Sequence, residues 1–177
     1  HLINGNTEQI ENALLNKEIE VGVVEGQSKN QSIKYVPFLK DELVLVCRAN
    51  HPLAQTNEIA IATLKTLRLV TRERGSGTLE VIEYALKPFE IKLSQLNIEM
   101  QLGSTESIKS YLMNSDCVAF ISIHAIEKEL KNNELTILDV KDLIIERYFY
   151  IITLQRKTDS LSELFIKNIS SYYNLKL

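Results

Sequence analysis

Residues 71–78 read Thr71-Arg72-Glu73-Arg74-Gly75-Ser76-Gly77-Thr78, a glycine-rich turn that follows an apolar strand-like run and opens a segment of helical period. Such a turn presents backbone N–H groups and hydroxyls to whatever lies in front of it, which suits a small anion. Two further turns have a similar design, Gly5-Asn6-Thr7-Glu8 and Gly103-Ser104-Thr105-Glu106. Together the three turns favour a shared binding cleft over three unrelated helix caps.

Short apolar runs recur between the segments of helical period, a pattern typical of a mostly parallel sheet covered on both faces. A further strand is predicted at Asn97–Leu102, where polar and apolar residues alternate, and we expect it nearer a sheet edge. The apolar runs predict strands at Glu20–Val24, Leu43–Arg48, Leu67–Thr71, Val118–Ile123 and Arg147–Leu154. Ligands gather at the carboxyl ends of strands in such α/β sheets, which is where the three turns lie.

Apolar residues at helical spacing predict helices with core-facing stripes. Capping boxes are expected at two helix starts, Asn6 with Gln9 and Ser160 with Glu163. The predicted stripes are Ile10, Ala13 and Leu14; Leu79, Ile82 and Leu86; Ile108 and Leu112; and Leu161, Leu164, Phe165 and Tyr172.

The composition indicates a globular chain. Its 177 residues are 45% hydrophobic, with only 6 glycines and 3 prolines, and can bury a core as one domain or as two small lobes. The net charge of −3 argues against a nucleic-acid surface on this chain, because phosphate binding needs clustered Lys and Arg.

The cysteines and the apolar runs bear on localisation. Cys47 and Cys117 lie in or beside apolar runs and predict buried thiols rather than a disulfide framework, which suits the cytoplasm. The apolar runs are too short to cross a bilayer, and no signal-peptide pattern opens the chain, so no membrane partner is expected. The chain begins at His1, which suggests a fragment or a processed product.

Catalytic and metal sites find little support in the sequence. Ser76, Asp116 and His124 could be assembled into a hydrolytic set on paper, but none of the 3 histidines has metal-ligand spacing. The Gly75–Thr78 turn lacks the lysine of a P-loop and is not a nucleophile elbow. We therefore expect no metal, no cofactor and no catalytic residue.

Noncovalent binding by hydroxyls and backbone N–H groups remains. Each turn could also serve only as a helix cap, which contributes about 1 kcal/mol. Arg72 could direct a positive charge toward a carboxylate, or could be a surface arginine paired with Glu73, and the sequence leaves both open.

The order of these motifs resembles the effector-binding domain of LysR-type transcriptional regulators over nearly the whole chain. The matching segments are Gly5–Ile10, Val21–Gly26, Val36–Val46, His51–Leu53, Arg72–Thr78, Leu102–Glu106 and Val118–Ser122. Where Asn114-Ser115-Asp116-Cys117 stands, relatives usually have a glycine-containing turn.

The resemblance implies an α/β fold of the type 2 periplasmic-binding-protein class, with two lobes and two crossover segments, near Val36–Phe38 and Asp139–Arg147. The first lobe would hold residues 1–38 and 145–177, and the second residues 39–144. The family's effector domain normally begins with a further strand and helix, preceded by a winged helix-turn-helix, and both are expected to be absent from this chain. The residues implied to bind effector are Thr7, Glu25, Arg72, Ser76, Gly77, Thr78, Ser104, Thr105 and Ser122.

The implied function is ligand sensing in the interlobe cleft by a bacterial transcription regulator. The implied partners are a small, anionic metabolite, DNA through the absent N-terminal domain, and further copies of the chain in a homodimer or tetramer. Two alternatives share the scaffold: a solute-binding protein of a transport system, and an enzyme such as a dehydratase or deaminase.

Overall fold

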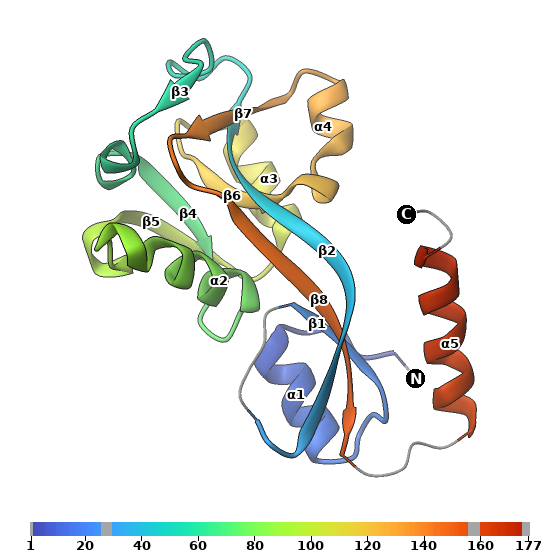
Figure 1. The fold of residues 1–177 in the computed structure, drawn as a ribbon. Helices are drawn as coiled ribbons and strands as arrows, with labels where there is room; N and C mark the ends of the chain where they lie inside the picture. The colour runs from blue at the N-terminus through green and yellow to red at the C-terminus, as the bar shows by residue number, and fades with distance from the viewer. Residues whose placement is uncertain (1, 26–29, 156–159, 175–177) are drawn as a thin grey trace. The chain divides into compact units, whose positions relative to one another are not determined.

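The computed structural model describes residues 2–25, 30–155 and 160–174, which form alternating strands and helices (Figure 1). The helices are α1 (Thr7–Leu15), α2 (Gly77–Leu86), α3 (Thr105–Met113), α4 (Glu127–Lys131) and α5 (Ser160–Asn174). The strands are β1 (Gly22–Glu25), β2 (Ile33–Arg48), β3 (Glu58–Ile59), β4 (Arg68–Arg72), β5 (Asn97–Leu102), β6 (Ala119–Ser122), β7 (Leu135–Val140) and β8 (Ile145–Leu154). None of the described helices is long and apolar enough to cross a membrane.

The chain divides into two compact units. The first unit comprises His1–Lys40, Gly75–Gly77 and Arg147–Leu177, and the second comprises Asp41–Arg74 and Thr78–Glu146. Strands β2 and β8 therefore each contribute residues to both units. The predicted lobe boundaries at 38/39 and 144/145 stay a prediction, and that prediction did not assign the short turn 75–77 to the first lobe.

The first unit is built on the pairing of β1 with β8, against which α1 packs. The two strands are antiparallel, with Gly22 opposite Ile152 and Glu25 opposite Phe149. The buried core of this unit consists of Ile10, Leu14, Val24, Ile33 and Ile152. This packing fixes the end of β1, and with it Glu25, relative to the start of α1.

The predicted capping box at the start of α1 is confirmed. Asn6 has extended backbone angles, and its Oδ1 accepts a hydrogen bond of 3.0 Å from the backbone N–H of Gln9. In return, Gln9 Oε1 accepts a hydrogen bond of 3.0 Å from the backbone N–H of Asn6. The two bonds satisfy N–H groups that the helix itself leaves unpaired, so α1 begins reliably at Thr7.

Strand β8 is also a neighbour of β2 in the sheet, and four further strand pairs lie in the second unit. Strand β2 pairs antiparallel with β6 and with β7, β3 pairs parallel with β7, and β4 pairs parallel with β5. Side chains of β2 alternate between two core clusters, with Leu45 and Cys47 in one and Val46 in the other. Both faces of β2 are therefore buried in this unit.

The prediction of a mostly parallel sheet is wrong, because the pairings of β1 with β8 and of β2 with β6 and β7 are antiparallel. The apolar run Leu43–Cys47 reports burial on both faces of a strand, and such burial does not fix the direction of its neighbours. Every predicted strand is present, but β3 and β7 were not predicted, and β2 begins at Ile33 rather than at Leu43.

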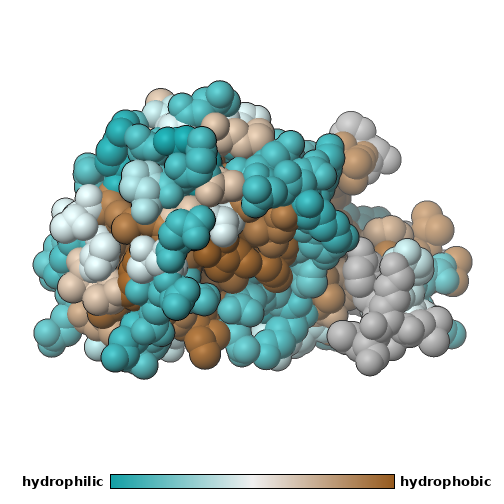
Figure 2. Space-filling model, turned by 90° about the horizontal axis from the view of Figure 1, so that it is seen from above, coloured by the Kyte–Doolittle hydropathy of each residue, from teal (hydrophilic) through white to brown (hydrophobic). Residues whose placement is uncertain are grey.

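The apolar stripe of the last helix was predicted to face the core, and this prediction is also wrong. Helix α5 is present, but Leu161 is 73% exposed, Leu164 55% and Tyr172 57%. Apolar residues at the molecular surface are visible in Figure 2. The capping box predicted for Ser160 and Glu163 involves the side chain of Ser160, which lies outside the described residues. Helical spacing indicates an apolar face, but it does not say that anything covers that face.

Candidate functional site

Within the first unit, the turn Gly75–Gly77 makes close contacts with α1 and with the end of β1. Gly75 has φ +82°, a conformation that strains any residue with a β-carbon. The backbone N–H of Glu8 donates a 3.2 Å hydrogen bond to the carbonyl oxygen of Gly75. A β-carbon added at Gly77 would lie 1.9 Å from the carbonyl oxygen of Glu25 and 2.8 Å from Oγ1 of Thr7. Both glycines are therefore required for the turn to reach β1.

The backbone of Glu25 meets the first residues of two helices. Thr7 begins α1, is buried, and donates a 2.8 Å hydrogen bond from Oγ1 to the carbonyl oxygen of Glu25. Gly77 begins α2 and touches the same carbonyl group. Helix N-termini carry partial positive charge, so this part of the first unit favours a negatively charged group.

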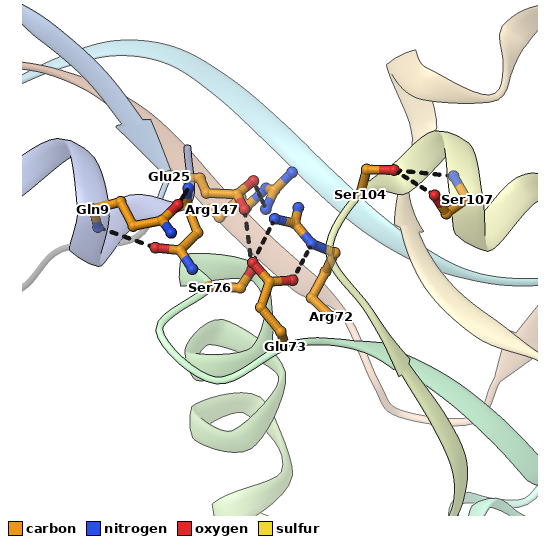
Figure 3. A network of polar contacts seen from close by, with 9 residues as sticks. Gln9, Glu25, Arg72, Glu73, Ser76, Ser104, Ser107 and Arg147 are labelled. Carbon is orange, nitrogen blue, oxygen red and sulfur yellow. Dashed lines mark hydrogen bonds and ion pairs between the residues drawn. The ribbon is translucent and has the colours of Figure 1, made fainter. Parts of the chain in front are cut away.

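The carboxylate of Glu25 binds two side chains, one from the turn and one from β8 (Figure 3). Its Oε2 accepts a hydrogen bond of 2.5 Å from Nη1 of Arg147, and its Oε1 lies 3.4 Å from the hydroxyl of Ser76. The guanidinium of Arg147 also lies over the Phe149 ring, 5.0 Å from its centroid. Ser76 is fully buried, and the Arg147 side chain is only 4% exposed.

The structure thus brings together four of the predicted residues, Thr7, Glu25, Ser76 and Gly77. That they bind an effector stays a prediction. Arg147 was missed as a site residue because it was counted only as the end of a crossover segment and the start of a strand. A lone arginine that opens an otherwise apolar strand was the available signal, since such a charge needs a partner when the strand is buried.

The second unit holds further predicted residues at the start of α3 and at the end of β6. Ser104 caps α3, because its hydroxyl accepts a 3.1 Å hydrogen bond from the backbone N–H of Ser107, and Thr105 follows as the first helical residue. Ser122 donates a 2.7 Å hydrogen bond to Oδ1 of Asp41, a carboxylate that is 3% exposed. These residues remain predicted binding groups.

Arg72 and Thr78 lie on either side of the turn. The guanidinium of Arg72 binds both carboxylate oxygens of Glu73, at 2.9 Å and 3.1 Å, so the pairing that the sequence left open is present (Figure 3). Thr78 is buried as the second residue of α2. A role for either residue in effector binding stays a prediction.

A surface pocket of about 860 Å³ opens beside α3 in the second unit, lined in part by Arg68, Tyr111 and Asp116. Its charged groups are already paired, since Arg68 and Tyr111 bind Glu99 and Asp116 binds Arg48. The bonds from Arg68 and then Tyr111 lower the pKa of Glu99 to about 2. The charged groups that line this pocket therefore make contacts within the second unit.

The three residues that could form a hydrolytic set on paper, Ser76, Asp116 and His124, each contact a different partner. Ser76 binds Glu25, Asp116 binds Arg48, and Nδ1 of His124 lies 3.6 Å from Glu127.

The two cysteines and the acidic groups of the described residues are further candidates for thiolate and metal chemistry. Burial raises the pKa of the Cys47 thiol to about 11 and also raises the pKa of Cys117, so neither is poised as a thiolate. Over residues 2–25, 30–155 and 160–174, no group of three or more His, Cys, Asp or Glu could hold a metal ion.

Sequence comparison gives a family and a set of curated relatives. The family model described as the LysR substrate binding domain matches residues 1–172. The HTH-type transcriptional regulator CysL of Bacillus subtilis is 27% identical over 98% of this chain and 57% of its own length. A probable RuBisCO transcriptional regulator of Synechocystis is 32% identical over 87% of this chain and 46% of its own length. The chain thus spans about half the length of the curated relatives it matches.

Solved structures agree with this result. The regulatory domain of CcmR from Synechocystis, described in complex with 2-PG, is 28% identical and superposes with a TM-score of 0.83 over 94% of this chain and 79% of its own. The effector binding domain of QuiR, described in complex with shikimate, shares the fold with a TM-score of 0.82 at 19% identity, over 95% of this chain and 78% of its own. The fold is therefore that of LysR effector-binding domains, and the resemblance predicted from motif order is confirmed. The chain belongs to the LysR substrate-binding domain family.

Proposed function

We propose that this chain binds a small acidic metabolite at the end of β1 and that it serves as the sensing domain of a LysR-type transcriptional regulator. The observation that carries the proposal is the meeting of Thr7, Gly77 and Ser76 at Glu25 in the first unit. Two helix starts, a buried hydroxyl and the guanidinium of Arg147 form a donor set suited to an anion.

The relatives support this choice of ligand class. The CcmR domain, the more similar of the two liganded neighbours, is described in complex with 2-PG, and QuiR with shikimate. We propose that Thr7, Ser76 and Gly77 contact the ligand in the first unit and that Glu25 lines the same site. We also propose effector-binding roles for Arg72, Thr78, Ser104, Thr105 and Ser122.

For the whole protein we propose the roles that the curated relatives' names indicate. Relatives about twice as long are HTH-type regulators, so DNA binding would belong to a further domain. We place such a regulator in the bacterial cytoplasm as a homodimer or tetramer, without catalytic activity. A bound ligand changes DNA binding only by its difference in affinity between two conformations of the protein. The transport alternative is disfavoured because the curated relatives are regulators.

Calorimetry and thermal unfolding of the purified chain test the proposal. The panel contains 2-PG, shikimate, sulfate, sulfite, O-acetylserine and sugar phosphates. A ligand present at 100 times its Kd should stabilise the chain by about 2.7 kcal/mol, which raises the Tm by roughly 5 to 10 °C. NMR of the bound ligand after long incubation should show no turnover. A panel that leaves both Tm and heat signal unchanged would overturn the proposal.

A pair of serine variants locates the site. Ser76→Ala removes the buried hydroxyl and should weaken ligand binding by about tenfold, as expected for one hydrogen bond. Ser171→Ala removes an exposed hydroxyl from α5 and should leave the affinity unchanged. Equal affinities for the two variants would exclude Ser76 from the site.

A further inference from the structure

Glu25 and Arg147 form a largely buried ion pair in the region proposed to bind the effector. Arg147 Nη1 lies 2.5 Å from Glu25 Oε2, with the Arg147 side chain 4% exposed and the Glu25 side chain 17% exposed. A charge removed from water in this way must keep a partner, because leaving it unpaired is strongly unfavourable. Any ligand that takes Arg147 must therefore supply a negative charge of its own.

The Glu25 carboxylate uses donors that would also suit an acidic ligand. It lies within reach of the Ser76 hydroxyl and the Arg147 guanidinium, as Figure 3 shows. Carboxylate, sulfate and phosphate groups all bind hydroxyls and guanidinium groups in the same way. Glu25 thus holds a negative charge where the acidic group of a ligand would be placed.

Two anions cannot share this position without cost. At the effective dielectric constant near 20 that describes protein sites, two like unit charges about 4 Å apart lower the affinity by about a thousandfold. An acidic ligand therefore binds either weakly beside Glu25 or more tightly after the carboxylate has moved away.

The structure separates a fixed backbone from an exchangeable side chain at Glu25. The carbonyl group is held by Thr7 and pressed against Gly77, so β1 itself has little room to shift. The carboxylate is partly exposed, and its bond to Ser76 is long at 3.4 Å. The carboxylate, unlike the backbone carbonyl group, can change position by rotation about the side-chain bonds.

We propose that Glu25 is a built-in competitor of the effector: the acidic group of the ligand binds Arg147 and Ser76 in exchange for the Glu25 carboxylate. This inference rests on the proposed function and specifies the regulation of the same site. Arg147 is the residue at which the chain re-enters the first unit along β8. Ligand binding thus changes the partner of a charge at one of the two strands that connect the units.

Titration calorimetry with sodium sulfate and with 2-PG, at fixed ionic strength, tests the exchange. Glu25→Gln removes the competing charge and should tighten binding of both probes by tenfold or more. Arg147→Gln should abolish binding. Glu18→Gln makes the same change of net charge at an exposed residue of the first unit and should bind like the unsubstituted chain.

The outcomes separate this inference from the proposed function. If the unsubstituted chain binds 2-PG but Glu25→Gln binds it equally well or more weakly, the competitor role is wrong while the sensing function stands; weaker binding would in addition show that the Glu25 carboxylate contacts the ligand. If neither protein binds any probe, both proposals fail. Should Glu25→Gln not fold, Glu25→Asp keeps the charge, reaches Arg147 less well, and should still bind both probes more tightly than the unsubstituted chain does.

Discussion

Gly77 lies against Glu25 so closely that a β-carbon at position 77 would stand 1.9 Å from the Glu25 carbonyl oxygen and 2.6 Å from its carbonyl carbon. Both atoms belong to the backbone, which cannot rotate out of the way as a flexible side chain can. The glycine-rich turn is therefore fitted to the end of β1 as well as to the start of α2.

We expect Gly77→Ala to destabilise the chain by about 1 to 3 kcal/mol, the usual cost of forcing extra atoms into a packed site. Denaturant unfolding measures the change. Gly103→Ala is the matched control, because a β-carbon added there meets nothing within 4 Å, and its stability should change by less than about 0.5 kcal/mol. Equal effects of the two variants would contradict the close approach at Gly77.

Thr7→Val tests the hydrogen bond that joins α1 to β1. Valine has nearly the shape of threonine but lacks the hydroxyl, so the carbonyl oxygen of Glu25 loses a partner at 2.8 Å. We expect a loss of about 1 to 3 kcal/mol in unfolding free energy. Thr66→Val removes an exposed hydroxyl that bonds to the nearby Thr63 carbonyl, and it should cost less than about 0.5 kcal/mol. A Thr7 variant as stable as the Thr66 variant would exclude a structural role for this bond.

The predicted and unpredicted parts of the site differ in the kind of signal they leave in the sequence. Gly77 and Thr7 could be singled out because turn glycines and polar residues at helix starts are local features, each decided by a few neighbouring residues. The Glu25–Arg147 pair joins residues far apart in the chain, and its formation depends on the register of β1 with β8. Without that register, Arg147 is only the start of an apolar strand.

The same distinction applies to the fold. The apolar runs located the buried strands, because burial of Leu45 and Val46 on opposite faces of β2 excludes polar residues. Those runs did not indicate the direction of the strands. Strand β7 was not predicted, because Thr136 and Asp139 interrupt its apolar pattern. Pairing is a tertiary property, so it became visible only in the structure.

Glu99 should make the stability of the second unit depend on acid pH. The Arg68 and Tyr111 bonds lower its pKa from 4.5 to about 2 in the folded chain. Between these two values the unfolded chain binds more protons, so the stabilisation is complete above about pH 4.5 and is lost as the pH falls toward 2. Glu99→Gln should therefore show a shallower loss of unfolding free energy over this window than the unsubstituted chain.

The control for this measurement is Glu83→Gln, which removes an exposed carboxylate from α2. When denaturant unfolding is measured at each pH, this variant should lose unfolding free energy between about pH 4.5 and pH 2 as steeply as the unsubstituted chain does. If Glu99→Gln loses unfolding free energy just as steeply over this pH range, the Arg68–Glu99–Tyr111 contacts do not contribute to stability in solution.

The apolar face of α5 gives a prediction that separates helical pattern from burial. Leu164 on α5 is 55% exposed, whereas Leu14 on α1 is fully buried in the first-unit core. The same substitution at the two positions therefore removes very different amounts of buried surface. Leu14→Ala should cost about 2 to 5 kcal/mol, while Leu164→Ala should cost less than about 1 kcal/mol, with alanine also favouring the helix.

Denaturant unfolding at low protein concentration is the measurement, because self-association at higher concentration would itself cover the α5 face. A Leu164→Ala cost near that of Leu14→Ala would mean that this face is packed in solution, and the exposure described for α5 would then be wrong.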